Sequence, residues 1–276
     1  MSLATYAEVV ANARAADGFV LVERDGAHAV VTMNDPEHLN ALSAELTVQL
    51  RLTLSELALD PSLRAIVLTG TDPAFSAGGD LRLMRDVARP MLEEGEGGGT
   101  EIWRWIRNEF GAIAKLITRT DKAFIAAVNG AAAGVGLAFA LACDILLASE
   151  QARIVPAFAG VGLIPEVGTS WQLTRRLGYQ RTFELFATGR HLSGAEAAEM
   201  GIANAVVAHA DLLDQALARV AQIEGAPEHV ITMMKPLLRN AADMTWEQAI
   251  AMEEFAEPSC FTTRAHREAV TRLLAH

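Results

Sequence analysis

Residues 123–149, AFIAAVNGAAAGVGLAFALACDILLAS, constrain the fold more than any other part of the chain. The run is long enough to cross a membrane, which takes about 20 apolar residues. Most of its residues are small, however, and Asn129-Gly130 places a turn signal inside it. The run therefore predicts a buried strand, a turn, a helix of small residues and another buried strand, and we expect no membrane span.

The alternation of strands and helices begins earlier in the chain. Asp25-Gly26 separates two β-rich runs, which predicts a hairpin. Ser43 is a candidate N-cap for a helix with leucines at helical spacing, and RAIVLTG (64–70) follows as a buried strand. Residues 88–101 combine Pro, acidic residues and a glycine run, so we expect a mobile surface loop there.

The β signals nearly vanish after about Gly168, apart from ANAVVA at 203–208. This change of composition predicts an α/β fold with two parts: a core over residues 1–200 that carries the active site, and a helical C-terminal region over 201–276. The C-terminal helices either close the core or pack against another subunit.

Charge and cysteine content exclude several classes of protein. The formal net charge of −11 argues against a nucleic-acid partner, because Lys and Arg dominate binding to the phosphate backbone. Cys143 and Cys260 form no CxxC motif, and the N-terminal segment lacks the pattern of a secretory signal, so we expect a cytoplasmic protein with Cys143 as a buried apolar residue. No HExxH motif or clustered ligand set predicts a metal site.

Two glycine-bearing turns remain as candidates for chemistry. AFSAGGDLRLM (74–84) and NGAAAGVG (129–136) each lie between an apolar run and a helical pattern, and neither fits a nucleotide-binding loop. Glycine lets the backbone approach a ligand closely, and the free N–H groups at a helix start favour negative charge. Two such amides converging on one oxygen would form an oxyanion hole. The spacing alone fits two purely structural turns as well.

The sequence resembles the enoyl-CoA hydratase/isomerase, or crotonase, superfamily over roughly residues 18–270. The segments that carry the resemblance are MNDPEHLNALS, AFSAGGDL, AAVNGAAAGVGLAFALACDILLAS, GLIPEVGTSWQLTRRLG and ATGRHLSGAEAAEMGIANAVV. The resemblance implies a crotonase-like spiral of ββα repeats with a helical C-terminal trimerisation region, and hence a homotrimer or a hexamer of two trimers. It also implies an acyl-CoA thioester as substrate, with coenzyme A as part of that substrate and no separate cofactor.

Matching the motifs assigns the two oxyanion-hole amides to Gly79 and Val135. The resemblance also implies a set of substrate and CoA contacts: Glu37, His38, Ala77, Asp80, Leu81, Gly134 and Phe158. Arg82 or Arg85 is the candidate for the CoA phosphates, although either side chain fits a solvated helix face as well. Trp103, Trp105 and Phe110 lie where relatives line the acyl chain, with core packing as the alternative.

The two positions at which hydratases of this family carry catalytic glutamates are occupied here by Ala138 and Phe158. Neither side chain transfers protons. Glu166, in GLIPEVGTS, lies where some double-bond isomerases of the superfamily carry their acid. One carboxylate is enough for a 1,3-proton shift, and burial by the neighbours of Glu166 (Leu163, Ile164, Pro165 and Val167) would raise its pKa. Alternatively, Glu166 is a turn residue favoured by the dipole of the helix that follows.

Double-bond isomerisation of an enoyl-CoA, with Glu166 as acid and base, is therefore the predicted reaction. One rival is a hydratase or another reaction of the family that uses an acid such as Glu101 or Glu109. The other rival is a non-catalytic acyl-CoA binder that keeps the oxyanion hole and has lost the acids.

Overall fold

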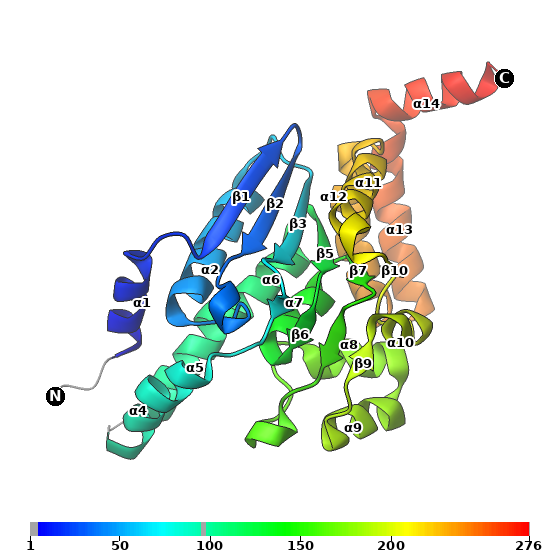
Figure 1. Cartoon of the computed structure of the whole chain (residues 1–276). Coiled ribbons are helices and arrows are strands. Elements are labelled where there is room, and N and C mark those ends of the chain that lie inside the picture. Colours follow the sequence, from blue (N-terminus) through cyan, green and yellow to red (C-terminus); the bar gives the residue numbers. More distant parts are fainter. Residues whose placement is uncertain (1–4, 95–97, 276) are drawn as a thin grey trace.

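The computed structural model describes residues 5–94 and 98–275, and the statements below concern these residues. They form two sheets, with strand orders β1-β2-β3-β5-β7-β10 and β4-β6-β8-β9 (Figure 1). The strands of the large sheet are β1 Val20–Asp25, β2 His28–Met33, β3 Ala65–Gly70, β5 Ala123–Val128, β7 Ile145–Ser149 and β10 Ala205–Val207. Those of the small sheet are β4 Ala74–Ser76, β6 Ala131–Ala133, β8 Arg153–Val155 and β9 Leu192–Ser193.

The helices surround the two sheets and continue beyond them. They are α1 Tyr6–Arg14, α2 Ala44–Leu59, α3 Leu81–Leu83, α4 Arg89–Glu94, α5 Gly98–Trp105, α6 Gly111–Arg119, α7 Gly134–Ala142, α8 Thr169–Leu177, α9 Tyr179–Thr188, α10 Gly194–Glu199, α11 Leu212–Glu224, α12 Glu228–Ala241, α13 Trp246–Phe261 and α14 Arg264–Leu274. None of them, within the described ranges, has the length and apolar character that crossing a membrane would require.

Several local predictions are confirmed. β1 and β2 pair antiparallel around Asp25-Gly26, with Asp25 opposite His28. Ser43 caps α2, because its side chain accepts a hydrogen bond from the Leu46 N–H. Residues 123–149 form β5, β6, α7 and β7, and all nine residues of α7 are buried. Small side chains let this helix pack deep inside the core.

The predicted crotonase fold is confirmed by a repeated ββα unit. A buried strand of the large sheet leads into a short strand of the small sheet and then into a helix, as in β3–β4–α3 and β5–β6–α7. β3, β5 and β7 pair in parallel, and so do β4, β6 and β8. Because parallel strands end at the same edge of a sheet, the turns after β4 and β6 lie next to each other.

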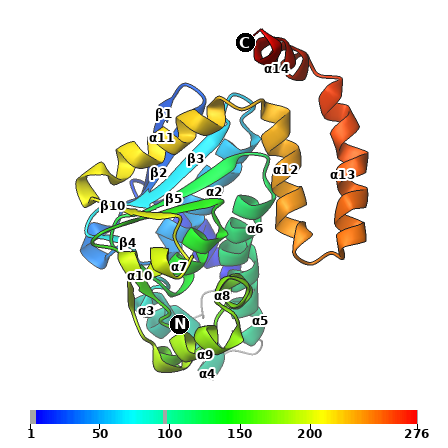
Figure 2. The ribbon, with the colours of Figure 1, turned by 90° about the vertical axis from the view of Figure 1, so that its right-hand side faces the viewer.

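The large sheet is covered on both faces (Figure 2). On one face, α11 packs Leu212, Ala216 and Val220 against side chains of β2, β3, β5 and β7. The main core lies on the other face and includes buried side chains of α2, α6 and α7. Burial on both faces explains why β3 and β5 consist almost wholly of apolar residues.

The C-terminal residues divide into two groups. β10 pairs in parallel with β7, and α11 lies on the sheet, so both contribute to the core. α14 projects beyond the rest of the molecule in both views, and Figure 2 shows α13 on the outer side of α12, apart from the sheets (Figures 1 and 2). The domain boundary at residue 200 stays a prediction, while the change from core packing to extended helices follows α12, whose Lys235 is still buried.

The predicted mobile loop over residues 88–101 is wrong for most of its length. Arg89–Glu94 form α4, and Gly98–Trp105 form α5; residues 95–97 lie outside the described part. Pro90 lies within a helical segment that is continuous from Leu81, directly after a π-turn over Met84–Ala88 in which the Arg89 N–H donates to the Met84 carbonyl. The ion pair of Arg89 with Glu93, four residues apart, further supports this helix.

Candidate active site

The structure brings the two predicted oxyanion segments together at the carboxyl edge of the small sheet. Ser76 of β4 pairs with Ala132 of β6, so the turn that carries Gly79 lies beside the start of α7. Gly78 has a φ of +88°, and a Cβ built on it would lie 2.6 Å from the carbonyl oxygen of Ala133. Only glycine fits this contact, which lies one residue before Gly79 and two before Val135.

The amides of both predicted residues are free. Val135 is 2% exposed and lies in the first turn of α7, whose N-cap Ala133 provides no side-chain hydrogen bond. Gly134 is buried and begins the helix, and Gly79 is half-buried. Within residues 5–94 and 98–275, no hydrogen bond has the N–H of Gly79 or of Val135 as donor. An unpaired N–H group inside a protein is rare, and a ligand oxygen would satisfy it.

The loop of residues 35–42 runs along the Gly79 turn. The Ala77 N–H donates to the carbonyl of Leu39 (2.9 Å), and the Leu42 N–H donates to the carbonyl of Gly78 (2.7 Å). The predicted CoA contacts Glu37 and His38 lie in a short 3₁₀ helix of this loop, Pro36–His38, and both are exposed. The imidazole Nδ1 of His38 lies 2.8 Å from a carboxylate oxygen of Asp35.

Asn40 was missed by the sequence analysis. Its side chain is fully buried and donates to the carbonyls of Thr71 (2.7 Å) and Ala74 (2.6 Å), while its Oδ1 accepts from the Asp35 N–H. Asn40 therefore joins the loop of residues 35–42 to the segment that leads into β4. The only local signal was its residue type, because Asn tolerates the positive φ of 53° found here.

The residues after Gly79 form a small charged cluster. Asp80 caps α3 through the Arg82 N–H and forms an ion pair with the Arg82 guanidinium (2.8 Å), while Leu81 is exposed. Burial alone would raise the pKa of Asp80, but the hydrogen bonds and charge of Arg82 lower it overall. Arg85 pairs with Asp86 at 2.6 Å. Each candidate phosphate-binding arginine thus has a carboxylate partner that a CoA phosphate would have to displace.

Glu166 occupies a strained turn before α8. Its carbonyl accepts two hydrogen bonds from Thr169, from the N–H (3.0 Å) and from the hydroxyl (2.7 Å). The next residue, Val167, has a φ of +55°, a conformation that β-branched residues rarely adopt and that costs about 1–3 kcal/mol. No local sequence pattern indicated this strain. Strain that the surrounding structure maintains is concentrated at functional sites.

The carboxyl group of Glu166 is half-buried and has no hydrogen bond or ion pair with any other described residue. Burial raises its pKa above the ordinary value of 4.5, as predicted. Two of the residues expected to bury it do not do so, since Leu163 is 44% exposed and Ile164 is 81% exposed. Pro165 and Val167, like Glu166 itself, are half-buried.

The two positions that lack a glutamate are deeply buried. Ala138 is 1% exposed inside α7, and Phe158 is 2% exposed, with its ring against that of Phe186 at a centroid distance of 5.9 Å. Apolar side chains thus fill both places where a hydratase would need proton-transferring groups.

The alternative acids are already paired. Glu109 is fully buried, accepts the Arg51 Nε–H at 2.6 Å and accepts the Tyr6 hydroxyl at 2.8 Å. Glu101 pairs with Arg104 and accepts the Tyr6 N–H at 2.8 Å. Both carboxylates therefore connect α1 to residues 98–110 through hydrogen bonds from Tyr6.

The aromatic residues predicted near the acyl chain divide between core and surface. Phe110 belongs to the main core and packs edge-to-face against Trp105, with ring centroids 5.9 Å apart. Trp103 is 53% exposed, with the Arg107 guanidinium 4.8 Å from its ring centroid. Core packing explains Phe110 and Trp105.

An apolar pocket of about 360 Å³ lies beside the Glu166 turn. It is lined by Leu163, Ile164 and Pro165 on one side and by side chains of α8 and α9 on the other. Gly79, Val135 and Glu166 do not line it, so the pocket by itself does not define the reactive centre. The free amides and the unpaired carboxyl group define the candidate site.

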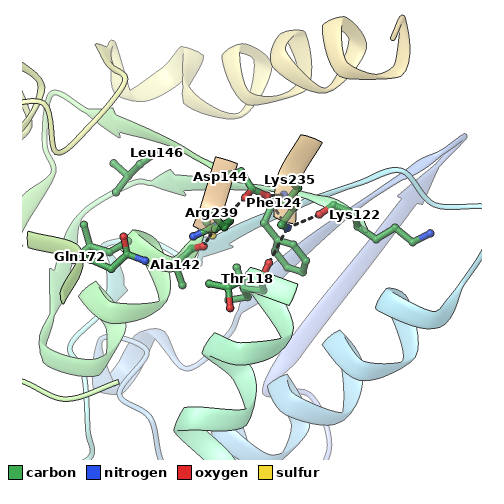
Figure 3. Close-up of polar contacts among 12 residues, drawn as sticks. Thr118, Lys122, Phe124, Ala142, Asp144, Leu146, Gln172, Lys235 and Arg239 are labelled. Atoms are coloured by element: carbon green, nitrogen blue, oxygen red, sulfur yellow. Dashed lines mark hydrogen bonds and ion pairs between the residues drawn. The ribbon is translucent and has the colours of Figure 1, made fainter. Parts of the chain in front are cut away.

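Charged side chains bind the C-terminal end of α7 (Figure 3). Arg239 of α12 donates to the carbonyl of Ala142 (2.6 Å) and pairs with Asp144 (2.6 Å). Lys235 pairs with Asp144 at 2.8 Å and donates to the carbonyls of Ile117 and Lys122. Cations at helix C-termini are favourable, so this cluster stabilises the ends of α6 and α7.

Cys143 ends α7 and is buried, as predicted. Burial raises the pKa of its thiol far above the ordinary value, so the thiol is not activated as a nucleophile. Among the described residues, no group of three or more His, Cys, Asp and Glu side chains is arranged to hold a metal ion.

Comparison with known proteins identifies the family. The family model for enoyl-CoA hydratase/isomerase matches residues 23–274. A probable enoyl-CoA hydratase of Rhizobium meliloti (strain 1021) is 32% identical over 258 residues, which are 93% of this chain and 95% of the relative. The 1,2-epoxyphenylacetyl-CoA isomerase of Escherichia coli (strain K12) is 30% identical, over 93% of this chain and 95% of the relative.

Solved structures agree with this assignment. The enoyl-CoA hydratase of Mycobacterium smegmatis superposes with a TM-score of 0.84 at 28% identity, covering 94% of this chain and 97% of the other. The family match, the relatives and the ββα spiral lead to the same conclusion: the chain is a member of the enoyl-CoA hydratase/isomerase family, with the crotonase fold.

Proposed function

We propose that this protein shifts the double bond of an enoyl-CoA, with Glu166 as the acid and base. The observation that carries the proposal is that Glu166 has an unpaired carboxyl group, while the two positions of the hydratase glutamates have none. Glu166 is half-buried, unpaired among the described residues and raised in pKa, whereas Ala138 and Phe158 occupy the two hydratase positions. The relatives are named both as hydratases and as isomerases, so they support acyl-CoA chemistry without favouring either reaction.

The proposed reaction needs a single proton carrier. Ionised Glu166 removes a proton from carbon 2 of a 3-enoyl-CoA, and the electron pair of the C–H bond moves into the dienolate and onto the thioester oxygen. The free amides of Gly79 and Val135 stabilise the negative charge on that oxygen. Glu166 then returns the proton to carbon 4, the double bond lies between carbons 2 and 3, and no water is consumed.

The raised pKa of Glu166 suits both proton transfers. A general acid–base group works best when its pKa lies near the working pH, because one group must first accept and then donate the proton. Glu37, His38, Ala77, Asp80, Leu81 and Arg82 remain the proposed CoA contacts. Gly134 and Phe158 remain proposed substrate contacts.

Glu166→Gln tests this function, with 3-enoyl-CoA and 2-enoyl-CoA supplied in heavy water and the products followed by mass spectrometry. We expect wild-type protein to interconvert the two substrates with deuterium uptake and no gain of water. The variant should lose at least about 100-fold in kcat and still bind the thioester. Glu150→Gln, the same chemical change at an exposed position, is the control.

The other outcomes would overturn the proposal. Hydration of 2-enoyl-CoA without conversion of 3-enoyl-CoA would make the protein a hydratase that uses another acid. Binding of the thioester with no conversion or exchange would make it a non-catalytic acyl-CoA binder. An unchanged kcat in Glu166→Gln would remove Glu166 from the mechanism.

We also propose a homotrimer, alone or paired as a hexamer, built through the C-terminal helices. Large apolar side chains on α13 and α14 are exposed: Trp246 at 72%, Phe255 at 87%, Leu273 at 75% and Leu274 at 82%. Exposed apolar surface of this kind is typical of protein–protein contacts. Light scattering coupled to size-exclusion chromatography would measure the mass, and a monomer would contradict this proposal.

A further inference from the structure

Ser76 lies between the segments that carry the two free amides. It is the last residue of β4 and is fully buried. Its hydroxyl donates to the carbonyl of Asn40 (2.8 Å) and accepts the Gly78 N–H (3.1 Å). The hydroxyl therefore joins the loop of residues 35–42 to the Ala77–Gly78 peptide, one peptide before the Gly79 amide.

Ser76 also contacts α7. A Cβ built on Gly136 would lie 2.6 Å from the Cβ and 2.8 Å from the hydroxyl oxygen of Ser76, so the absence of a side chain at residue 136 lets α7 approach this closely. The backbone of Gly78 meets the carbonyl of Ala133 in a second contact. The Gly79 turn and the first turn of α7 are thus fixed to each other at two points, and Ser76 forms one of them.

We infer that Ser76 is a positioning residue that sets the separation and direction of the Gly79 and Val135 amides. The inference rests on the proposed function, because it takes these amides to be the ones that hold the thioester oxygen. Without the hydroxyl, the buried Gly78 N–H and the Asn40 carbonyl lose their partner. The Ala77–Gly78 peptide can then shift and move the adjoining peptide that carries the Gly79 N–H, whose only remaining hydrogen bond in the described residues is that of the Gly78 carbonyl with the Leu42 N–H. A displacement of about 1 Å can cost about 100-fold in rate, because hydrogen bonds to the oxyanion depend on both distance and angle.

The chain contains a matched control in Ser149. Like Ser76, it ends a strand and is fully buried. Its hydroxyl donates to the carbonyl of Asn129 (2.7 Å) and accepts the N–H of the residue two positions later, Gln151 (3.2 Å). The two serines make the same two kinds of hydrogen bond, but Ser149 touches neither the Gly79 turn nor Gly136 in these interactions.

The experiment compares Ser76→Ala with Ser149→Ala in three measurements. The first is kcat and KM with 3-enoyl-CoA, and the second is the urea midpoint of unfolding. The third is the infrared C=O stretch of a bound saturated acyl-CoA, which needs no turnover. Donors aimed at the thioester oxygen polarise the carbonyl and lower its stretching frequency.

We expect both variants to lower the urea midpoint, because each leaves buried polar groups unpaired. Only Ser76→Ala should lower kcat, by about 10- to 100-fold with little change in KM, because the lost interaction belongs to the transition state. Only this variant should return the carbonyl frequency toward that of the free thioester. If Ser76→Ala does not fold, Ser76→Cys takes its place, since it keeps the volume and a weak donor.

Several results would overturn the inference. These are an unchanged kcat and carbonyl frequency in Ser76→Ala, an equal loss of kcat in Ser149→Ala, or no frequency shift in the wild-type complex. Failure of the proposed reaction would look different. In that case wild-type protein would not convert 3-enoyl-CoA, yet it would shift the carbonyl frequency and lose that shift in Ser76→Ala, which supports the positioning role.

Discussion

The backbone groups at the two ends of α7 differ in their hydrogen-bond partners. At the N-terminal end, the Val135 amide has no partner among the described residues, and no side chain caps the helix. At the C-terminal end, Arg239 binds the Ala142 carbonyl, and Asp144 holds both Arg239 and Lys235 (Figure 3). All nine residues of α7 are buried.

This difference shows how one helix serves two purposes. A buried helix end without partners is costly, so the charged cluster at the C-terminal end contributes to holding α7 in place. The free amides at the other end have the arrangement that binding of a ligand oxygen requires. Changes at the C-terminal end should therefore mainly affect stability, and changes at the N-terminal end should mainly affect catalysis.

The largest effect is expected from Asp144→Asn at the C-terminal end. The variant leaves Lys235, whose side chain is 5% exposed, without its counter-ion. Removing one partner of a buried pair costs about 3–5 kcal/mol, and the lower end applies because the Asp144 side chain is 23% exposed. Urea unfolding would measure the loss, and kcat of the folded variant should stay near that of wild type.

Glu56→Gln is the control, since Glu56 and Arg24 form a surface pair with side chains 77% and 45% exposed, and the change should cost less than about 1 kcal/mol. Equal losses in the two variants would contradict the role of the buried cluster. A large loss of kcat in folded Asp144→Asn would contradict the separation of the two ends.

The next effect is expected from Gly136→Ala at the N-terminal end. The new Cβ would lie 2.6 Å from the Cβ of Ser76, so the first turn of α7 must shift. We expect kcat to fall by about 100-fold, equivalent to about 2.7 kcal/mol in the activation barrier. Overpacking should cost about 1–3 kcal/mol in the free energy of unfolding.

Gly99→Ala provides the comparison, because a Cβ at Gly99 meets nothing within 4 Å. Its kcat should match that of wild type. Steady-state kinetics would measure kcat for both variants. Full activity of Gly136→Ala would show that the close contact between Gly136 and Ser76 does not set the position of the Val135 amide.

The smallest effect is a pH dependence of stability at the C-terminal end. Burial lowers the pKa of Lys235 below its ordinary value of 10.5, although Asp144 acts in the opposite direction. Between the lowered pKa and 10.5, the unfolded chain binds more protons than the folded protein, so this lysine makes the free energy of unfolding rise with pH. Wild type should therefore gain stability relative to Lys235→Met as the pH rises toward 10.5.

Urea unfolding of both proteins at several pH values above 8 would measure this gain. Parallel curves for wild type and Lys235→Met would show that the pKa of Lys235 is not lowered in the folded protein. The kcat of wild type is measured over the same pH range, to show whether the N-terminal end of α7, which carries the Val135 amide, is affected as well.

The candidate site could be predicted in part, because its chemistry is carried by short motifs. The glycine-bearing turns and the resemblance pointed to Gly79, Val135 and Glu166, and the structure places the Gly79 turn against the start of α7. The positive φ of Val167 had no signal in the sequence, because valine is a poor residue for that conformation. Asn40 and Ser76 act through backbone groups of distant residues, which no local pattern reveals.

Features that depend on neighbouring residues could be predicted from the amino-acid sequence. The hairpin at Asp25-Gly26, the Ser43 cap and the small-residue helix of residues 134–142 follow from turn chemistry, capping and side-chain size. The hydrogen bond of Glu101, in the helix of residues 98–105, with Tyr6 and the ion pairs of Asp144 with Lys235 and Arg239 could not be predicted in this way. The physical reason is that these features depend on groups far apart in the chain, whose burial and pairing exist only after the chain has folded.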